Sequence, residues 1–237
     1  MPSKVIVIPA RMKSSRFPGK PLFKIKGLTI LERVYLQCLK AAKHKQIYVA
    51  TESKEIVSFC KKKNIQCINT GKAETALDRI AKFSYHIQSD FYVNVQGDEP
   101  IIDPRDIKKI MKFSNKYKNA VLIGKAKCNK KTFYDLSKAK IVTDKKNKVL
   151  YSSRNGIPIT NKNKFIRAEK AIWIYSLPKK LIRLYHRSKQ TNLEKIEENE
   201  VLRFMEIGID VYAIDLIGKS WAVDEKKDIN FIKKFLS

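Results

Sequence analysis

The sequence predicts an α/β fold in which a mostly parallel central sheet is covered by helices on both faces. Short apolar segments alternate with amphipathic segments of helical spacing through the first half of the chain. The 237 residues, 43% of them hydrophobic, are enough to bury a core of ordinary size. No internal repeat, low-complexity tract or linker divides the chain, so we expect a single domain spanning residues 1–237.

Strands and helices are expected to alternate over the first half. Residues 5–8 form the apolar run Val-Ile-Val-Ile, which is typical of a strand buried on both faces. Apolar residues then recur at helical spacing through residues 28–41. Asp103 precedes Pro104 and is a suitable N-cap for a helix that begins there. The further expected pairs are strand 46–50 with helix 54–63, strand 66–69 with helix 74–87, and strand 91–95 with helix 104–117.

The second half predicts a β-hairpin and a different order of elements. Residues 140–143 and 149–152 are strand-like and flank the polar turn 144–148, which favours a hairpin. A continuous helix is expected over residues 194–207. The other expected elements are strands 121–128, 170–177 and 211–215 and helices 179–187 and 228–236.

The chain is strongly basic, because 50 Lys and Arg residues outnumber 23 Asp and Glu residues and give a formal net charge of +27. Such a charge suggests nucleic-acid binding. However, forty of the basic residues are lysine and ten are arginine, whereas geometric recognition of phosphates and base edges favours the forked guanidinium. We therefore expect a lysine-rich solvated surface and no specific nucleic-acid partner. A general attraction to polyanions is the alternative.

No apolar run reaches the length of about 20 residues that a helix needs to cross a membrane. The chain enters its first expected strand directly after residues 1–4, without a segment of signal-peptide character. We expect a cytoplasmic protein with no membrane partner.

The first expected strand leads into a basic, hydroxyl-rich loop in the stretch VIVIPARMKSSRFPGKPL. The hydroxyls of Ser14 and Ser15 and the N–H groups of the loop can surround an oxyanion. Compensating positive charge comes from Arg11, Arg16 and Lys20. Neither the Walker A spacing nor G-x-G-x-x-G is present. Because ligands of such sheets bind beyond the carboxyl ends of strands, the loop predicts a nucleotide phosphate site.

A second constellation, VNVQGDEP, follows another expected strand. Gly97 allows a close backbone approach, and Asp98 and Glu99 place two carboxylates at the strand's carboxyl end. Asp98 suits a hard cation such as Mg²⁺ that bridges triphosphate oxygens; an exposed turn is the alternative. Asp224, in WAVDEKKD, also follows a short apolar stretch and is either a second metal carboxylate or a helix cap.

Together these segments resemble the 3-deoxy-manno-octulosonate (Kdo) cytidylyltransferases, also called CMP-Kdo synthetases. The resemblance runs from residue 5 to about residue 232 and is strongest in IPARMKSSRFPGKPL and VNVQGDEP. Supporting segments are IYVAT, LDRIA, VLYSSRNGIP, LEKIEENEVLRFMEIG and VDEKKD. The resemblance implies a Rossmann-like nucleotidyltransferase fold with a small hairpin-bearing region for dimerisation and sugar binding, and a homodimer.

The resemblance also implies a Mg²⁺-dependent reaction. The anomeric hydroxyl of a 3-deoxy-ulosonic acid attacks the α-phosphate of CTP, and pyrophosphate leaves. Arg11, Lys20 and Asp98 match catalytic positions, and Asp98 and Asp224 match the magnesium-binding aspartates. The residues that match nucleotide-binding positions are Ala10, Arg11, Ser14, Ser15, Lys20, Arg79 and Gln96. The residues that match sugar-binding positions are Arg16, Gln96, Arg154, Tyr175, Glu194 and Glu197.

The sugar side departs from the family pattern, whereas the nucleotide side does not. Residues 72–77 lack the histidine and the Gly-Thr pair of the family segment. Ala171, Trp173 and Val201 stand where the family carries histidine, glycine and glutamine. Loss of hydrogen-bonding groups changes which hydroxyl pattern a pocket prefers. The acceptor therefore stays open among Kdo, a modified Kdo such as 8-amino-Kdo, and another acidic sugar of surface polysaccharide.

Two alternative functions follow from the same residues. A basic α/β module could bind RNA or another polyanion without catalysis, but such a module has no use for carboxylates at Asp98 and Asp224. A nucleotidyltransferase for a neutral sugar phosphate would need a second phosphate-binding cluster, which Arg154 and Arg167 could furnish. Residue types do not decide between CTP and UTP.

Overall fold

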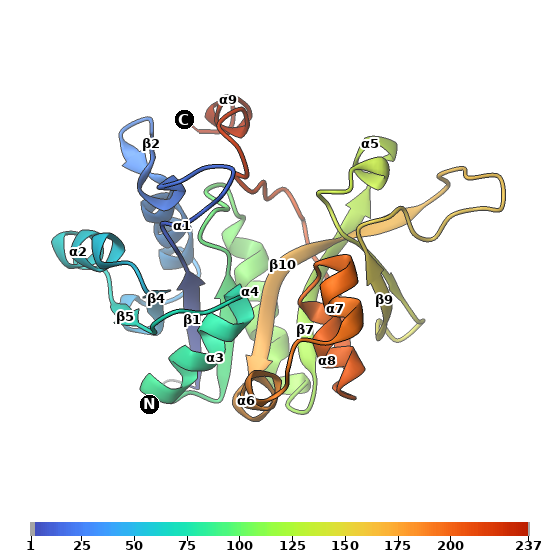
Figure 1. Ribbon diagram of the computed structural model, residues 1–237, viewed down its shortest axis with the longest axis horizontal. Coiled ribbons are helices and arrows are strands. Elements are labelled where there is room, and N and C mark those ends of the chain that lie inside the picture. The colour runs from blue at the N-terminus through green and yellow to red at the C-terminus, as the bar shows by residue number, and fades with distance from the viewer. Residues whose placement is uncertain (1–2, 237) are drawn as a thin grey trace.

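The computed structural model describes residues 3–236, which form a mixed central sheet with helices on both faces (Figure 1). The strands are β1 (Lys4–Pro9), β2 (Lys24–Ile25), β3 (Leu28–Thr29), β4 (Ile47–Thr51), β5 (Cys67–Asn69), β6 (Phe91–Val95), β7 (Val121–Cys128), β8 (Lys140–Thr143), β9 (Val149–Ser153), β10 (Ala168–Pro178) and β11 (Val211–Asp215). The α-helices are α1 (Ile30–Leu39), α2 (Lys54–Lys62), α3 (Ala76–His86), α4 (Pro104–Phe113), α5 (Lys130–Tyr134), α6 (Lys179–Arg187), α7 (Asn192–Glu197), α8 (Val201–Glu206) and α9 (Asp228–Lys233). No helix within residues 3–236 combines the length and the apolarity needed to cross a membrane.

The central sheet brings the carboxyl ends of β1, β4 and β6 to one edge. Its strands follow the order β11-β7-β10-β6-β1-β4-β5, with β8 and β9 attached beside β10. β1 runs parallel to β4 and β6, and β11 runs parallel to β7, whereas β10 runs antiparallel between β6 and β7. The expected α/β fold with a mostly parallel sheet is confirmed, and the loops after β1 and β6 emerge side by side.

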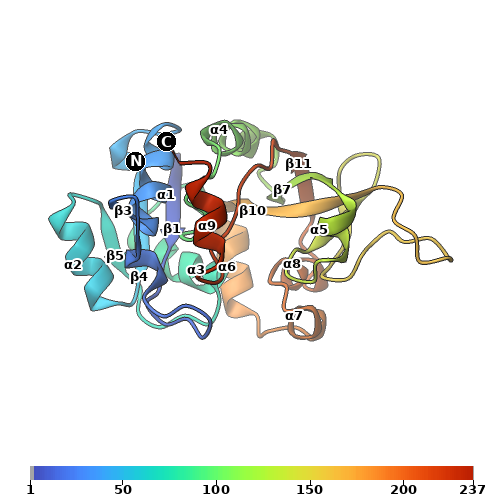
Figure 2. The ribbon, with the colours of Figure 1, turned by 90° about the horizontal axis from the view of Figure 1, so that it is seen from above.

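Residues of β1 alternate between two hydrophobic cores. Val5 and Val7 pack with α3, α6 and α8 on one face, whereas Ile6 and Ile8 pack with α1, α2 and α4 on the other. All four side chains are fully buried, which accounts for the continuous apolar run in the sequence. Figure 2 shows α4 and α6 on opposite sides of β10.

A third apolar cluster ties the end of the chain to the loop after β1. Ile229 and Ile232 of α9 pack with Phe17, Ile25 and Ile30. Phe17 is only 2% exposed although it lies in the basic loop. The helix α9 therefore lies near the β2–β3 hairpin (Figure 1) and supports the loop from outside.

Most of the expected elements agree with the structure. The elements whose expected and observed bounds coincide are 91–95, 121–128, 179–187 and 211–215. β8 and β9 form the expected antiparallel hairpin, and the Asp103 side chain caps α4 by accepting a hydrogen bond from the N–H of Arg105. The short elements β2, β3 and α5 were not predicted.

The expected continuous helix over residues 194–207 is wrong, because the structure divides it into α7 and α8. Glu198 adopts a left-handed conformation with φ 46°, which ends α7. Arg203 on α8 can then reach back to Glu194 on α7 and form a buried ion pair of 2.6 Å. In a straight helix these two residues would stand about 14 Å apart along the axis.

Gly124 on β7 leaves no room for a side chain. A Cβ at this position would lie 2.4 Å from Leu216 Cδ1 and 2.9 Å from Ile172 Cβ. We expect Gly124→Ala to lower the free energy of unfolding by about 1–3 kcal/mol, because β7 and β10 must move apart. Urea unfolding followed by circular dichroism measures the change. Lys127→Ala, at an exposed position of the same strand, should change it by less than about 0.5 kcal/mol, and an equal effect of the two variants would contradict the packing argument.

Candidate functional site

A cavity of about 270 Å³ opens where the carboxyl ends of β1 and β6 meet. Its walls are drawn from residues 9–21, 73–79 and 96–98, together with Asp224. Every residue predicted to bind the nucleotide or the metal lines this cavity, as does Arg16. The structure therefore brings together, from four distant parts of the chain, the groups that sequence reasoning assigned to one site.

The loop after β1 is held by backbone contacts and by one buried anchor. The N–H of Ala10 donates to the carbonyl of Ala50 at 3.0 Å, which continues the pairing of β1 with β4. The N–H of Gly19 donates to the carbonyl of Met12 at 3.0 Å and closes the loop. With Phe17 buried in the third apolar cluster, the polar residues on either side of it are left at the cavity.

Gly97 permits the β6 connection to approach β1. A Cβ at this position would lie 2.5 Å from the carbonyl oxygen of Pro9. Because that atom belongs to the backbone of the central strand, any side chain at position 97 would push the two loops apart. The close approach predicted for Gly97 is therefore observed.

Contacts between their backbone segments bring Asp98 and Asp224 together. The N–H of Val223 donates to the carbonyl oxygen of Asp98 at 2.8 Å. Lys20 Nζ donates to Asp98 Oδ2 at 2.7 Å and to the carbonyl oxygen of Val223 at 2.6 Å. Arg16 Nη2 lies 3.0 Å from Asp224 Oδ1. Each carboxylate thus faces a cation supplied by the loop after β1.

The donor set fits a divalent cation that is shared with a phosphate ligand. Asp98 and Asp224 offer hard carboxylate oxygens, and ammonium and guanidinium groups already lie against them. Within residues 3–236 no group of three or more His, Cys, Asp or Glu side chains could hold a metal ion alone. Mg²⁺ is usually bound by one or two carboxylates, with substrate phosphates and water completing its shell. Two carboxylates beside a basic loop match that pattern.

Arg79 forms a rigid part of the cavity wall. Its guanidinium donates to Glu52 Oε2 at 3.0 Å, to Thr70 Oγ1 at 3.1 Å and to the carbonyl of Gly71 at 3.1 Å. Burial opposes ionisation of Glu52, but the hydrogen bond and charge of Arg79 outweigh it and leave the pKa of Glu52 below its ordinary value. The predicted nucleotide contact is therefore fixed in place by α3 and the β4 and β5 loops.

Two of the predicted sugar-binding residues lie outside the lining of this cavity and contact each other. The Glu197 carboxylate accepts hydrogen bonds from Ser153 Oγ at 2.8 and 3.0 Å and from the N–H of Arg154 at 3.0 Å. Arg154 Nη2 donates to the carbonyl of Glu198 at 2.9 Å. These contacts join β9 to α7, and the role of both residues toward a sugar stays a prediction.

Two further predicted sugar-binding residues, Tyr175 and Glu194, are buried and also lie outside the cavity lining. Glu194 accepts from two nitrogens of Arg203, each at 2.6 Å. The Tyr175 hydroxyl has no hydrogen-bond partner among the described residues. Their role toward a sugar likewise stays a prediction.

Three polar residues that line the cavity, Lys13, Glu74 and Thr75, were not among the predicted site residues. Thr75 caps α3 by accepting from the N–H of Asp78 at 3.1 Å. The spacing Thr75-x-x-Asp78 is a helix-start signal that could have moved the expected start of this helix from residue 74 to 76. Behind the cap, Glu200 Oε2 accepts from the N–H of Leu77 at 3.3 Å, a contact with no local sequence signal.

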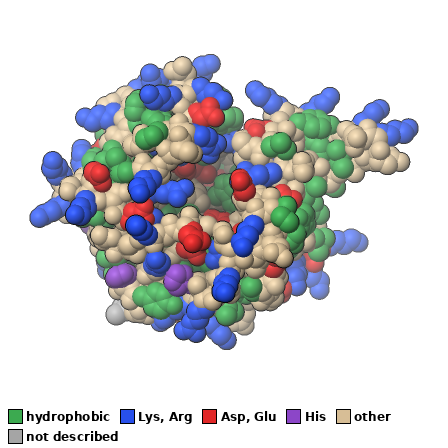
Figure 3. All heavy atoms as spheres, in the orientation of Figure 1, with side chains coloured by type: hydrophobic (Ala, Val, Ile, Leu, Met, Phe, Trp, Pro, Cys, Tyr) green, Lys and Arg blue, Asp and Glu red, His purple; other side chains and the backbone are tan. Residues whose placement is uncertain are grey.

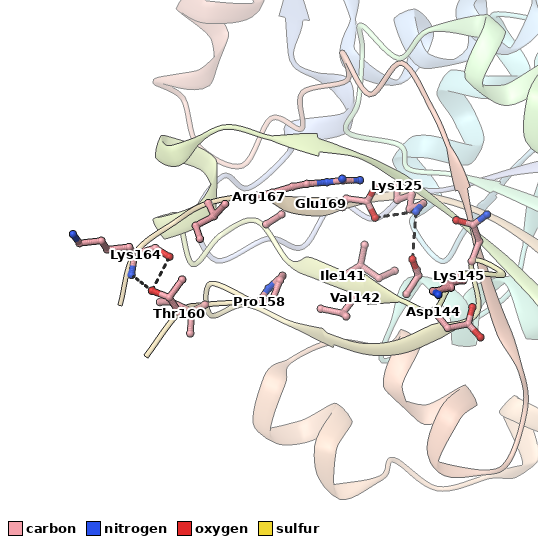
Figure 4. Close-up of a pocket in the computed structure, with 15 residues that line it drawn as sticks. Lys125, Ile141, Val142, Asp144, Lys145, Pro158, Thr160, Lys164, Arg167 and Glu169 are labelled. Atoms are coloured by element: carbon pink, nitrogen blue, oxygen red, sulfur yellow. Dashed lines mark hydrogen bonds and ion pairs between the residues drawn. The ribbon is translucent and has the colours of Figure 1, made fainter. Parts of the chain in front are cut away.

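A larger cavity of about 650 Å³ lies beside the β8–β9 hairpin (Figure 4). In its wall Lys125 donates to Glu169 at 2.9 Å and to Thr143 at 3.4 Å. Arg167 lines this second cavity, whereas Arg154 lines neither. The two arginines therefore do not form the joint phosphate cluster that a neutral sugar phosphate would require.

On the face that Figure 3 shows, no single patch gathers the basic residues. Figure 3 shows Lys and Arg side chains scattered across the whole visible face, with carboxylates between them. This distribution agrees with the expected lysine-rich solvated surface.

Sequence comparisons identify a consistent set of relatives. The cytidylyltransferase family profile matches residues 5–215. A 3-deoxy-manno-octulosonate cytidylyltransferase of Koribacter versatilis is 31% identical over 234 residues, which cover 98% of this chain and 89% of the relative. The protein of the same name from Escherichia coli is 30% identical over 228 residues, which cover 94% and 92% of the two chains.

Solved structures also superpose on this chain over nearly its full length. CMP:2-keto-3-deoxy-manno-octonic acid synthetase complexed with CTP superposes with a TM-score of 0.91 at 28% identity, and the match covers 98% of both chains. A cytidylyltransferase from Leptospira borgpetersenii superposes with a TM-score of 0.63 at 17% identity, over 100% of this chain and 89% of the other. The second likeness concerns the fold alone.

The carboxyl group of Glu200 predicts a pH-dependent stability. Burial raises the pKa of Glu200 to about 7 from 4.5, and the negative charges of Asp78 and Glu194 act in the same direction. A carboxyl whose pKa is higher in the folded state stabilises that state at low pH, and this contribution is lost as the pH rises from 4.5 to about 7. The melting temperature of Glu200→Gln should therefore rise relative to the parent over this range. Thermal unfolding between pH 5 and pH 8 measures the difference, Glu198→Gln at an exposed position should show no trend, and a pH-independent difference for Glu200→Gln would contradict the raised pKa.

Proposed function

The chain belongs to the cytidylyltransferase family, and from this premise we propose that it transfers the cytidylyl group of CTP to a 3-deoxy-ulosonic acid sugar, with Kdo as the preferred acceptor. The products are the CMP-sugar and pyrophosphate. One observation carries the proposal: the cations of the loop after β1 and the carboxylates of Asp98 and Asp224 converge on a single cavity. A polyanion-binding module without catalysis would gain nothing from those carboxylates.

Binding of the triphosphate is assigned to the loop after β1. Arg11, Lys13 and Lys20 all line the cavity, and the loop that carries them is fixed by the buried Phe17. Cations held in place before the substrate arrives stabilise developing charge without reorganisation. In phosphoryl transfer this positioning and charge stabilisation make up most of the catalysis.

Asp98 and Asp224 are the residues that would hold Mg²⁺. When bound there, Mg²⁺ would supply positive charge that neutralises a triphosphate. Lys20 and Arg16 reach the same carboxylates, so these two side chains lie where metal and phosphate charges meet. A strongly anionic triphosphate would thereby meet positive charge from two sources, the metal ion and the basic side chains.

The acidic sugar is assigned to the mouth of the same cavity. The Arg16 side chain is 56% exposed there, so it can pair with a sugar carboxylate. The anomeric oxygen then forms a bond to the α-phosphorus while the bond to the pyrophosphate oxygen breaks. The proton of the attacking hydroxyl leaves to solvent, and we assign to Asp98, whose side chain lines the cavity, the task of favouring that loss.

The identity of the acidic sugar is the finer part of the proposal. Ala171 on β10 and Val201 at the start of α8, which replace polar residues of the family pattern, are buried in the hydrophobic core. Trp173 packs with its ring centroid 6.2 Å from that of Tyr175. Apolar side chains thus stand at positions where the family pattern carries polar ones, so modified Kdo acids belong in any test of the acceptor.

We also propose a homodimer formed through the hairpin region. The loop between β9 and β10 extends away from the molecule beyond the β8–β9 hairpin (Figure 1). It exposes Ile159 and Ile166, with exposed fractions of 46% and 76%. Light scattering should give twice the chain mass of 27.5 kDa, and Ile166→Lys should shift the protein toward the monomer because it places a charge in an apolar contact. Lys164→Ala should leave the mass unchanged, and a monomeric parent protein would contradict the proposal.

Pyrophosphate release tests the reaction directly. Purified protein with Mg²⁺ should release pyrophosphate when CTP and Kdo are both present, and the other nucleoside triphosphates should be poorer substrates. Asp98→Asn should lower kcat by about 10²–10³-fold or more, because a carboxylate that stabilises the transition state is lost. Asp90→Asn, at an exposed position before the same strand, is the matched control and should retain full activity.

Three results would separate the parts of this proposal. Release with 8-amino-Kdo but not with Kdo would keep the cytidylyl transfer and change the sugar. Full activity of Asp98→Asn, or of the parent enzyme in EDTA, would contradict the roles given to the carboxylates and to Mg²⁺. If no acidic sugar supports pyrophosphate release, the substrate assignment is overturned.

A further inference from the structure

The segment that carries Asp224 has no regular secondary structure. After β11 ends at Asp215, residues 216–227 of the described chain form neither helix nor strand until α9 begins. The segment passes from the β11 edge of the sheet toward the loop after β1 (Figure 1). Its backbone groups therefore depend on partners from other elements, and those partners decide where Asp224 lies.

Asp106 supplies two of these partners. It stands in the first turn of α4 and is 1% exposed. Asp106 Oδ1 accepts a hydrogen bond from the N–H of Ile217 at 2.8 Å, and Oδ2 accepts one from the N–H of Gly218 at 3.0 Å. Hydrogen bonds to an ionised carboxylate are stronger than neutral ones. Asp106 is not the cap of α4, because Asp103 fills that position.

Further contacts to the segment come from the same connection between β6 and α4. Ser220 Oγ donates to Glu99 Oε2, and the N–H of Val223 donates to the carbonyl of Asp98 at 2.8 Å. The acceptors at positions 98, 99 and 106 thus follow one another along one short stretch of chain. This stretch carries one of the two metal carboxylates and holds the segment that carries the other.

We propose that Asp106 is a positioning residue for Asp224, which holds residues 217–224 so that the Asp224 carboxylate faces Asp98 before CTP binds. The inference rests on the proposed function, because it takes Asp98 and Asp224 as the residues that bind a divalent cation with CTP. Asp106, Ile217 and Gly218 do not line the cavity, so Asp106 acts through Asp224 and not on the substrate.

The test is the metal affinity of Asp106→Asn. The amide keeps the shape of the side chain but turns an NH₂ group toward one of the two N–H donors, so one hydrogen bond is lost. Mn²⁺ binding in the presence of CTP, followed by electron paramagnetic resonance, should weaken by about 10- to 100-fold. CTP binding in EDTA, measured by calorimetry, should change by less than about twofold, because the loop after β1 keeps its own closing contact between Gly19 and Met12 and its buried anchor Phe17.

Two further variants distinguish positioning from general destabilisation. Asp103→Asn makes the same chemical change in the same helix turn and keeps a good N-cap, so its Mn²⁺ affinity should equal that of the parent. The double variant Asp106→Asn/Asp224→Asn should bind Mn²⁺ as weakly as Asp224→Asn alone, because Asp106 then has no carboxylate left to position. An additive loss in the double variant overturns the proposal.

Ser220→Ala keeps the proposal testable if Asp106→Asn does not fold. It removes the contact with Glu99 from the same segment and should weaken Mn²⁺ binding in the same direction by a smaller factor. Parent-like Mn²⁺ affinity in the folded variants overturns the positioning role and leaves the proposed function intact. If neither Mn²⁺ nor Mg²⁺ changes the affinity of the parent protein for CTP, the proposed function is overturned instead.

Discussion

The contact of Lys20 with both Asp98 and the carbonyl of Val223 is the interaction on which the proposed active site depends. Two carboxylates brought together in a partly buried cavity repel each other unless positive charge lies near them. Lys20 lies against the first carboxylate and bonds the segment that carries the second, while Arg16 pairs with Asp224. The chain therefore neutralises its own carboxylates with the same cations to which we assign the triphosphate. A cavity in which carboxylates and cations are paired in this way suits a ligand that contains both phosphate groups and a metal ion.

The central sheet makes this contact geometrically possible. β1 and β6 are parallel neighbours, so their carboxyl ends release the basic loop and the Asp98 loop side by side. Gly97 lets the second loop lie against the carbonyl of Pro9, and Phe17 anchors the first loop in the apolar cluster around α9. The positions of the charged residues at the cavity are thus fixed by backbone contacts and by the apolar core.

The region that the family pattern assigns to the sugar is held together differently, by a buried network of ion pairs. Arg203 bonds Glu194 and Asp78, which joins α3, α7 and α8, and its guanidinium lies 3.9 Å from the centroid of the Tyr185 ring. Such buried charges are tolerated only when they are paired and hydrogen-bonded. Glu200 stands beside this network, and burial raises the pKa of its carboxyl. Glu194, assigned to the sugar from the family pattern, is therefore also part of the framework.

The sequence by itself determined the α/β alternation, the buried strand at residues 5–8, the β8–β9 hairpin and the basic loop with Asp98, because apolar periodicity, turn residues and strand-end carboxylates are local features. It left Asp224 between a metal ligand and a helix cap, and it did not indicate the break at Glu198 or the role of Asp106. The tertiary structure alone shows that α9 has no side-chain cap and that Asp224 lines the cavity, whereas the metal role of Asp224 stays a prediction. It alone also shows the break at Glu198 and the contacts of Asp106. Asp106 meets its partners 111 and 112 residues along the chain, and a hydrogen bond between such distant residues leaves no pattern at either end until the sheet brings the two segments together.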